Sequence, residues 1–146
     1  MSTIKPAGQQ MAFFPHDASA SQDPKIQRLM YRTGFAGYGR WWRLCEYLAT
    51  ANDNRFRFET EEDVCIISMI LGFDPADVSC ADDPCFSCKA FIDTLVDIDL
   101  LIIDDDGFLS SRRMTKNARY SEERRSTGAR GGRPKKPTKA DEKPDQ

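Results

Sequence analysis

The 146-residue sequence has no long hydrophobic run. Its longest apolar stretch covers the eight residues 64–71 and includes Ser68, whereas a membrane-spanning helix needs about 20 apolar residues. The N-terminus also lacks the apolar core of a secretory signal and the arginines of a transit peptide. We therefore expect a soluble, cytoplasmic protein with no membrane partner.

The sequence is also poor in catalytic groups, because His16 is its one histidine. It contains no nucleophile elbow and no phosphate-binding glycine loop. The adjacent aspartates at 82–83 and 104–106 suit helix caps and turns, since neighbouring carboxylates do not converge on a substrate. We expect no enzymatic activity, no cofactor and no small-molecule substrate, and a structural role for His16 with its ring bonded to local backbone.

Five cysteines, an odd number without an export signal, favour free thiols over a disulfide framework. Cys80, Cys85 and Cys88 have a C-x4-C-x2-C spacing that is compatible with a metal site. However, only three thiols cluster there, and Cys88 falls on the apolar face of a predicted helix, so we predict no metal. Cys45 and Cys65 are predicted to be buried on helix faces as small hydrophobic residues.

Charge is distributed unevenly along the chain, although the net charge is only −2. Residues 1–110 carry 9 basic and 18 acidic side chains, and residues 111–146 carry 12 basic and 5 acidic side chains. An acidic body is thus joined to a basic C-terminal segment, which indicates an interaction with a polyanion.

Hydrophobic periodicity and capping signals predict a mainly α fold with a small β-hairpin. The predicted elements are helices 24–33 and 36–50 separated by Gly34, a strand at 55–58, a helix from a Thr60 cap through 64–71, a helix at 84–97 that begins at Asp83-Pro84, and strands 100–103 and 108–110 joined by an Asp-Gly turn. This order is that of a winged helix-turn-helix with an extra N-terminal helix. We expect a flexible lead at 1–12, the winged-helix domain at 13–110, a polar helix at 111–125 that leans on the body without completing the core, and a disordered basic tail at 126–146.

In such a fold the helix before the wing would enter the major groove of DNA. Here that helix carries Lys89 as its single cation, together with Asp93 and Asp97, and the wing tip is acidic. We therefore predict that nucleic acid is contacted by the basic segment instead. The candidate phosphate ligands are Arg112, Arg113, Lys116, Arg119, Arg124, Arg125, Arg130, Arg133, Lys135 and Lys136.

Two further basic groups have alternative interpretations. Residues 130–134, Arg-Gly-Gly-Arg-Pro, resemble an AT-hook with one extra glycine, which would lie in a narrow minor groove, although a solvated basic tail fits as well. Arg40, Arg43, Arg55 and Arg57 are predicted either to cluster into a positive surface or to form an ordinary solvated face.

Several motifs carry a resemblance to a known family. They are Phe-Phe-Pro-His-Asp-Ala at 13–18, Asp-Pro-Lys-Ile at 23–26, Gly-Phe-Ala-Gly-Tyr-Gly at 34–39 followed by Trp42, and Gly-Gly-Arg-Pro at 131–134. Over about residues 12–134 the chain resembles the N-terminal domain of phage replisome-organiser proteins. The resemblance implies a DnaD-like winged-helix domain used in phage or prophage DNA replication, where such domains bind DNA, self-associate or contact helicase-loading partners. The alternative is a protein-interaction or oligomerisation module without direct DNA binding.

Overall fold

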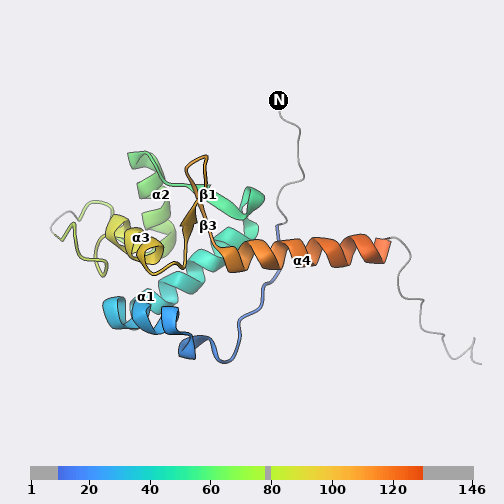
Figure 1. The fold of residues 1–146 in the computed structure, drawn as a ribbon. Helices are drawn as coiled ribbons and strands as arrows, with labels where there is room; N and C mark the ends of the chain where they lie inside the picture. The colour runs from blue at the N-terminus through green and yellow to red at the C-terminus, as the bar shows by residue number, and fades with distance from the viewer. Residues whose placement is uncertain (1–9, 78–79, 130–146) are drawn as a thin grey trace, which may run out of the picture.

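The computed structural model describes residues 10–77 and 80–129 (Figure 1). Four helices and a small sheet make up the fold, which is mainly helical as predicted. In chain order the elements are the 3-10 turn η1 (Ala20–Gln22), α1 (Pro24–Thr50), the 3-10 turn η2 (Asn52–Asn54), β1 (Arg55–Arg57), α2 (Glu61–Leu71), α3 (Cys88–Asp97), β2 (Ile102–Ile103), β3 (Phe108–Ser110) and α4 (Arg112–Ala129).

The first two predicted helices form the two halves of α1, which bends at Gly34. The backbone of this glycine has φ 73° and ψ −168°, a conformation that side chains with a Cβ rarely adopt. Asp23 begins the helix as predicted, because its carboxylate accepts a hydrogen bond of 2.8 Å from the backbone N–H of Lys25. Pro24 occupies the first turn, where a missing N–H costs nothing.

Helix α2 has the predicted capping box, since Thr60 and Asp63 exchange side-chain and backbone hydrogen bonds. It ends at Gly72, whose φ of 82° closes the helix in the left-handed region. Its burial differs from the prediction for Cys65, which is exposed. The apolar residues 64–71 surround α2 on more than one side, and only one side packs on the body, so some of these residues face solvent.

Helix α3 begins at Cys88, four residues after the predicted start. Ser87 caps it by accepting a hydrogen bond of 3.2 Å from the N–H of Ala90. Asp83 instead closes a turn, because its side chain accepts from the N–H of Cys85 and its carbonyl accepts from the N–H groups of Phe86 and Ser87. An aspartate before a proline therefore satisfies a turn here in the same way that it would cap a helix.

The predicted hairpin is present as β2 and β3, and β1 pairs with the outer edge of β3 to give the order β1-β3-β2, antiparallel throughout. Leu109 of β3 lies opposite Phe56 of β1 and Ile103 of β2. Gly107, with φ 84°, closes the turn by donating to the carbonyl of Asp104. Together with α2 and α3, this sheet gives the element order of a winged helix.

The core extends beyond the predicted domain at both ends. Met11 is buried, and its N–H donates to the carbonyl of Ala49 at 2.8 Å, so the predicted flexible lead holds a core residue. Met114 and Ala118 of α4 are also buried in the core, although α4 was expected only to lean on it. The helix continues to Ala129, past its predicted end, and the predicted disorder of residues 130–146 lies outside the described residues.

Candidate nucleic-acid interface

The most basic element of the described chain is α4, which Figure 1 shows extending away from the other helices. Its first turns are held to the body by Met114 and Ala118, and the hydroxyl of Ser111 accepts a hydrogen bond of 3.2 Å from the N–H of Met114. Its charged residues are Arg112, Arg113, Lys116, Arg119, Glu122, Glu123, Arg124 and Arg125. Cations outnumber carboxylates in α4, whereas carboxylates outnumber cations in residues 1–110.

The two arginines nearest the body are engaged by body carboxylates. Arg112 pairs with Asp99 at 2.8 Å, and Arg113 pairs with Asp17 at 2.8 Å. Lys25 also reaches Asp99, at 3.3 Å. The hydrogen bond from Lys25 is the largest cause that holds the pKa of Asp99 below its ordinary value, and the Arg112 charge adds to it. These two predicted phosphate ligands therefore help to fasten α4 to the body.

The other predicted ligands on α4 lie on two of its faces. Lys116 and Arg119 are exposed and follow Arg112 at helical spacing. Arg124 lies beside the ring of Tyr120, with 5.7 Å between the guanidinium carbon and the ring centroid. Arg125, together with Arg124, lines a groove against the N-terminal segment. The predicted ligands Arg130, Arg133, Lys135 and Lys136, and the sequence that resembles an AT-hook, lie outside the described residues.

The helix that usually enters the major groove, α3, turns its apolar side to the core. Its exposed residues include Lys89, Asp93 and Asp97, as the sequence predicted. Asp97 forms an ion pair of 2.8 Å with Arg32 of α1. This surface offers a phosphate backbone one cation of its own beside two carboxylates, which makes it electrostatically poor for DNA.

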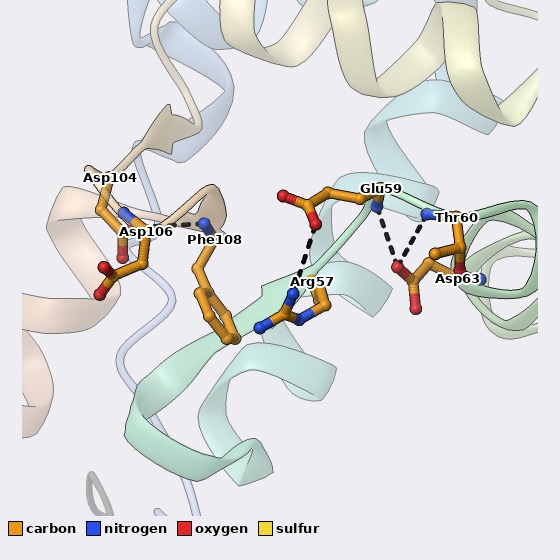
Figure 2. A network of polar contacts seen from close by, with 7 residues as sticks. All are labelled: Arg57, Glu59, Thr60, Asp63, Asp104, Asp106 and Phe108. Atoms are coloured by element: carbon orange, nitrogen blue, oxygen red, sulfur yellow. Dashed lines mark hydrogen bonds and ion pairs between the residues drawn. The ribbon is translucent and has the colours of Figure 1, made fainter.

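The acidic wing tip is organised by Asp104. Its Oδ1 accepts hydrogen bonds of 2.9 Å from the backbone N–H groups of Asp106 and Phe108 (Figure 2). Its Oδ2 accepts a hydrogen bond of 2.7 Å from Arg55. The bond from Phe108 is the largest cause that lowers the pKa of Asp104, and Arg55 contributes as well. Asp104 therefore closes the turn, in agreement with its predicted role.

Arg55 and Arg57 lie over one aromatic ring, that of Phe108, at 4.0 Å and 4.7 Å from its centroid. Each also has an acidic neighbour, because Arg57 pairs with Glu59 at 3.3 Å (Figure 2) and Arg55 pairs with Asp104. This pair of arginines therefore stabilises the sheet and wing and leaves little excess positive charge.

Arg40, which the sequence analysis grouped with Arg55 and Arg57, binds the end of α2 and the loop that follows it. Its guanidinium donates to the carbonyls of Leu71, Gly72 and Cys85 at 2.9 to 3.3 Å and stacks 3.8 Å from the ring centroid of Phe73. Its partners are mostly backbone carbonyls, which leave no pattern in a sequence. The four arginines consequently do not form the single positive surface that the sequence allowed.

The aromatic tract at the start of the chain packs against α1. The ring of His16 stacks on Trp42 with 3.7 Å between centroids and an interplanar angle of 14°, and Phe14 stacks on the same indole at 6.1 Å. The neighbour that the structure gives the His16 ring is the indole of Trp42, a contact that the sequence analysis did not predict, whereas the predicted bond to local backbone stays a prediction. This stacking fixes the N-terminal segment next to α4.

The cysteines show no shared site. Cys88 is buried, and burial raises the pKa of its thiol to about 11, while Cys80 is exposed. The thiol of Cys85 donates to the carbonyl of Arg32 at 3.7 Å. Within residues 10–77 and 80–129, no group of three or more His, Cys, Asp or Glu side chains is arranged to hold a metal ion.

The fold thus defines a winged-helix-type protein with a projecting basic helix. The chain belongs to a family described as Lin1244/Lin1753-like, N-terminal, whose model matches residues 13–113. The match spans the whole winged helix and ends inside the first turn of α4. No curated protein and no solved structure matches the chain. None of the helices in the described residues is sufficiently long and apolar to span a membrane.

Proposed function

We propose that this protein is a non-catalytic, DNA-associated accessory of phage or prophage replication, and that it contacts DNA through α4 and the basic segment that follows. The observation that carries the proposal is the projection of a basic helix away from an acidic body (Figure 1). Its family membership and its resemblance to phage replisome organisers supply the replication context.

The arrangement of charge supports this choice of element. Lys116 and Arg119 are exposed on α4, beyond the arginines that pair with body carboxylates. Cations of this kind displace condensed counterions from a phosphate backbone and bind it without reading sequence. The acidic face of α3 would meet the same backbone with repulsion.

Charge neutralisation in the full chain tests the proposal. The double variant Lys116→Gln with Arg119→Gln is expected to weaken binding to a labelled DNA duplex, and the slope of log affinity against log salt should shrink by about 0.9 per lost contact. Fluorescence anisotropy across a salt series measures both quantities. The matched control is Arg28→Gln with Arg43→Gln, two exposed cations of α1.

Equal affinities for the two double variants would overturn α4 as the contact surface. A quadruple variant, Arg130→Gln, Arg133→Gln, Lys135→Gln and Lys136→Gln, measures the share of the basic segment after α4. A chain truncated at Ser110 is unsuitable for this purpose, because it would also remove the core residues Met114 and Ala118.

A second candidate function, a protein-interaction or self-association module, is favoured by two exposed aromatic side chains of α1. Tyr31 is 91% exposed and Phe35 is 80% exposed, on either side of the bend at Gly34. Light scattering of the full chain and of Tyr31→Ser with Phe35→Ser tests it. A stable oligomer that this double variant dissociates, in a chain that binds no DNA, would favour the second candidate.

A further inference from the structure

A groove of about 840 Å³ runs between the N-terminal segment and α4. One wall is formed by residues 10–15 and the other by one face of α4, and none of the described residues that line the groove is acidic. Its lining includes Phe13, Asn117, Tyr120, Arg124 and Arg125. The described lining of this groove combines aromatic rings and cations with neutral side chains, whereas the body of the chain is acidic.

Two of these rings face solvent. Phe13 is 76% exposed and Tyr120 is 59% exposed. Exposed rings of this size contribute little to the core and offer flat apolar faces to a ligand. Arg124 lies beside the Tyr120 ring, so a cation accompanies a stacking surface at one point of the groove.

The walls of the groove are held in place by the body. The N–H of Met11 donates to the carbonyl of Ala49, and Phe14 stacks on Trp42, which fixes the N-terminal wall. The ion pair between Arg113 and Asp17 ties this wall to the start of α4. The groove is therefore formed before a ligand arrives, which reduces the entropy lost on binding.

One polar atom of the groove lining has an unmet hydrogen bond. The side-chain nitrogen of Asn117 is buried with no partner in the described part of the chain. Such orphaned groups are uncommon in native structures and call for an explanation. Because this nitrogen is buried, a ligand in the groove could accept from it only after the Asn117 side chain turns outward, so the binding proposed below rests on the exposed rings and the arginines.

We propose that this groove binds single-stranded nucleic acid, with bases stacked on Phe13 and Tyr120 and phosphates placed near Arg124 and Arg125. Aromatic faces together with cations along a groove are what unpaired bases and their backbone require. A duplex does not satisfy the same surface, because its base faces are already stacked on one another. This inference rests on the proposed contact of α4 with nucleic acid, and it specifies that the nucleic acid bound in the groove is single-stranded.

The test compares oligothymidylate of about 12 nucleotides, a size typical for such grooves, with a duplex of equal length, using fluorescence anisotropy and the full chain. Phe13→Ala and Tyr120→Ala are each expected to weaken single-strand binding about fivefold or more, while duplex binding changes little. Tyr120→Phe keeps the ring and should retain affinity. Tyr31→Ala is the control, since it removes a ring that is even more exposed, at 91%, from another surface.

The outcomes separate this inference from the proposed function. If Phe13→Ala and Tyr120→Ala bind the single strand as well as Tyr31→Ala does, the groove is overturned, whereas charge-dependent duplex binding would leave the proposed function standing. If wild-type protein binds neither form, both fail. Displacement of the oligonucleotide by polyglutamate at equal charge concentration would also overturn base stacking.

Two further measurements use the same protein. Photocrosslinking of 5-iodouracil within the oligonucleotide should map to the groove residues, and crosslinks confined to other surfaces would overturn the assignment. Replacing oligothymidylate with oligouridylate shows whether the strand is DNA or RNA, and tighter binding of either one than of the duplex supports the groove.

Discussion

Helices α3 and α4 differ in how much of each is buried and in the charge that each exposes. The side of α3 that faces inward carries Phe91 and Leu95, and its exposed side bears two aspartates beside Lys89. Among the residues of α4 whose burial is described, Met114 and Ala118 belong to the core, and most of the cations are exposed. Burial and positive charge therefore lie on different elements, and the place of a helix in the fold does not by itself show that it binds DNA.

The largest effect is expected at the centre of α3. Phe91→Ala should lower the free energy of unfolding by about 3–5 kcal/mol, because it removes a fully buried ring and leaves a cavity. Urea denaturation followed by circular dichroism measures the change. Lys89→Ala, on the exposed side of the same helix, serves as the control and should stay within about 0.5 kcal/mol.

Met114→Ala is expected to cost about 2–5 kcal/mol, because this side chain of α4 is buried in the core. Thr115→Ala, at the neighbouring exposed position, provides the comparison in the same denaturation experiment. A Met114→Ala protein as stable as wild type would show that burial of this side chain does not attach α4 to the body.

A smaller loss is expected from Gly37→Ala in the body helix α1. A Cβ at this position would overlap the side chain of Thr33, which is buried and donates to the carbonyl of Leu29 at 2.7 Å. Overpacking of this kind costs about 1–3 kcal/mol. Gly39→Ala has open space around its Cβ and should raise stability by about 0.5–1 kcal/mol through helix propensity. Thermal unfolding of both variants gives the sign of each change, and equal signs would contradict the packing argument.

The smallest effect concerns the attachment of α4 to the body through Asp99. Since the pKa of Asp99 is lower in the folded protein than its ordinary value, its ion pairs with Lys25 and Arg112 add stability above the unfolded pKa of about 3.9. That contribution is lost as pH falls through the folded pKa. Asp99→Asn should therefore destabilise the protein slightly at pH 7 and reduce the fall in stability on acidification. Urea denaturation of the wild type and of Asp99→Asn across a pH series measures both changes.

Local signals predicted most of the fold. Gly34, the capping box of Thr60 and Asp63, and the turn that ends at Gly107 each act through backbone groups within a few residues. Their energetics do not depend on distant contacts, so they can be recognised in a sequence. The local signal at Asp83 gave a wrong helix start, because an aspartate before a proline is compatible with a turn as well as with the first residue of a helix.

The candidate site was predicted only in part. The basic residues of α4 are visible as a change of charge along the chain, but the engagement of Arg112 by Asp99 and of Arg113 by Asp17 is not. The groove is also invisible in the sequence, since Phe13 and Tyr120 are distant along the chain and face the same hollow.

The sequence by itself determined the order of the elements, their caps and turns, and the change from acidic to basic character near residue 110. These properties depend on short-range hydrogen bonding, backbone conformation and composition. The tertiary structure alone decided that Met11 and Met114 belong to the core and that Arg40 binds the loop after α2. It also decided that aromatic rings and arginines line one groove beside α4. Such contacts join residues far apart in the chain, and the free energy that selects them comes from packing and pairing in the folded protein.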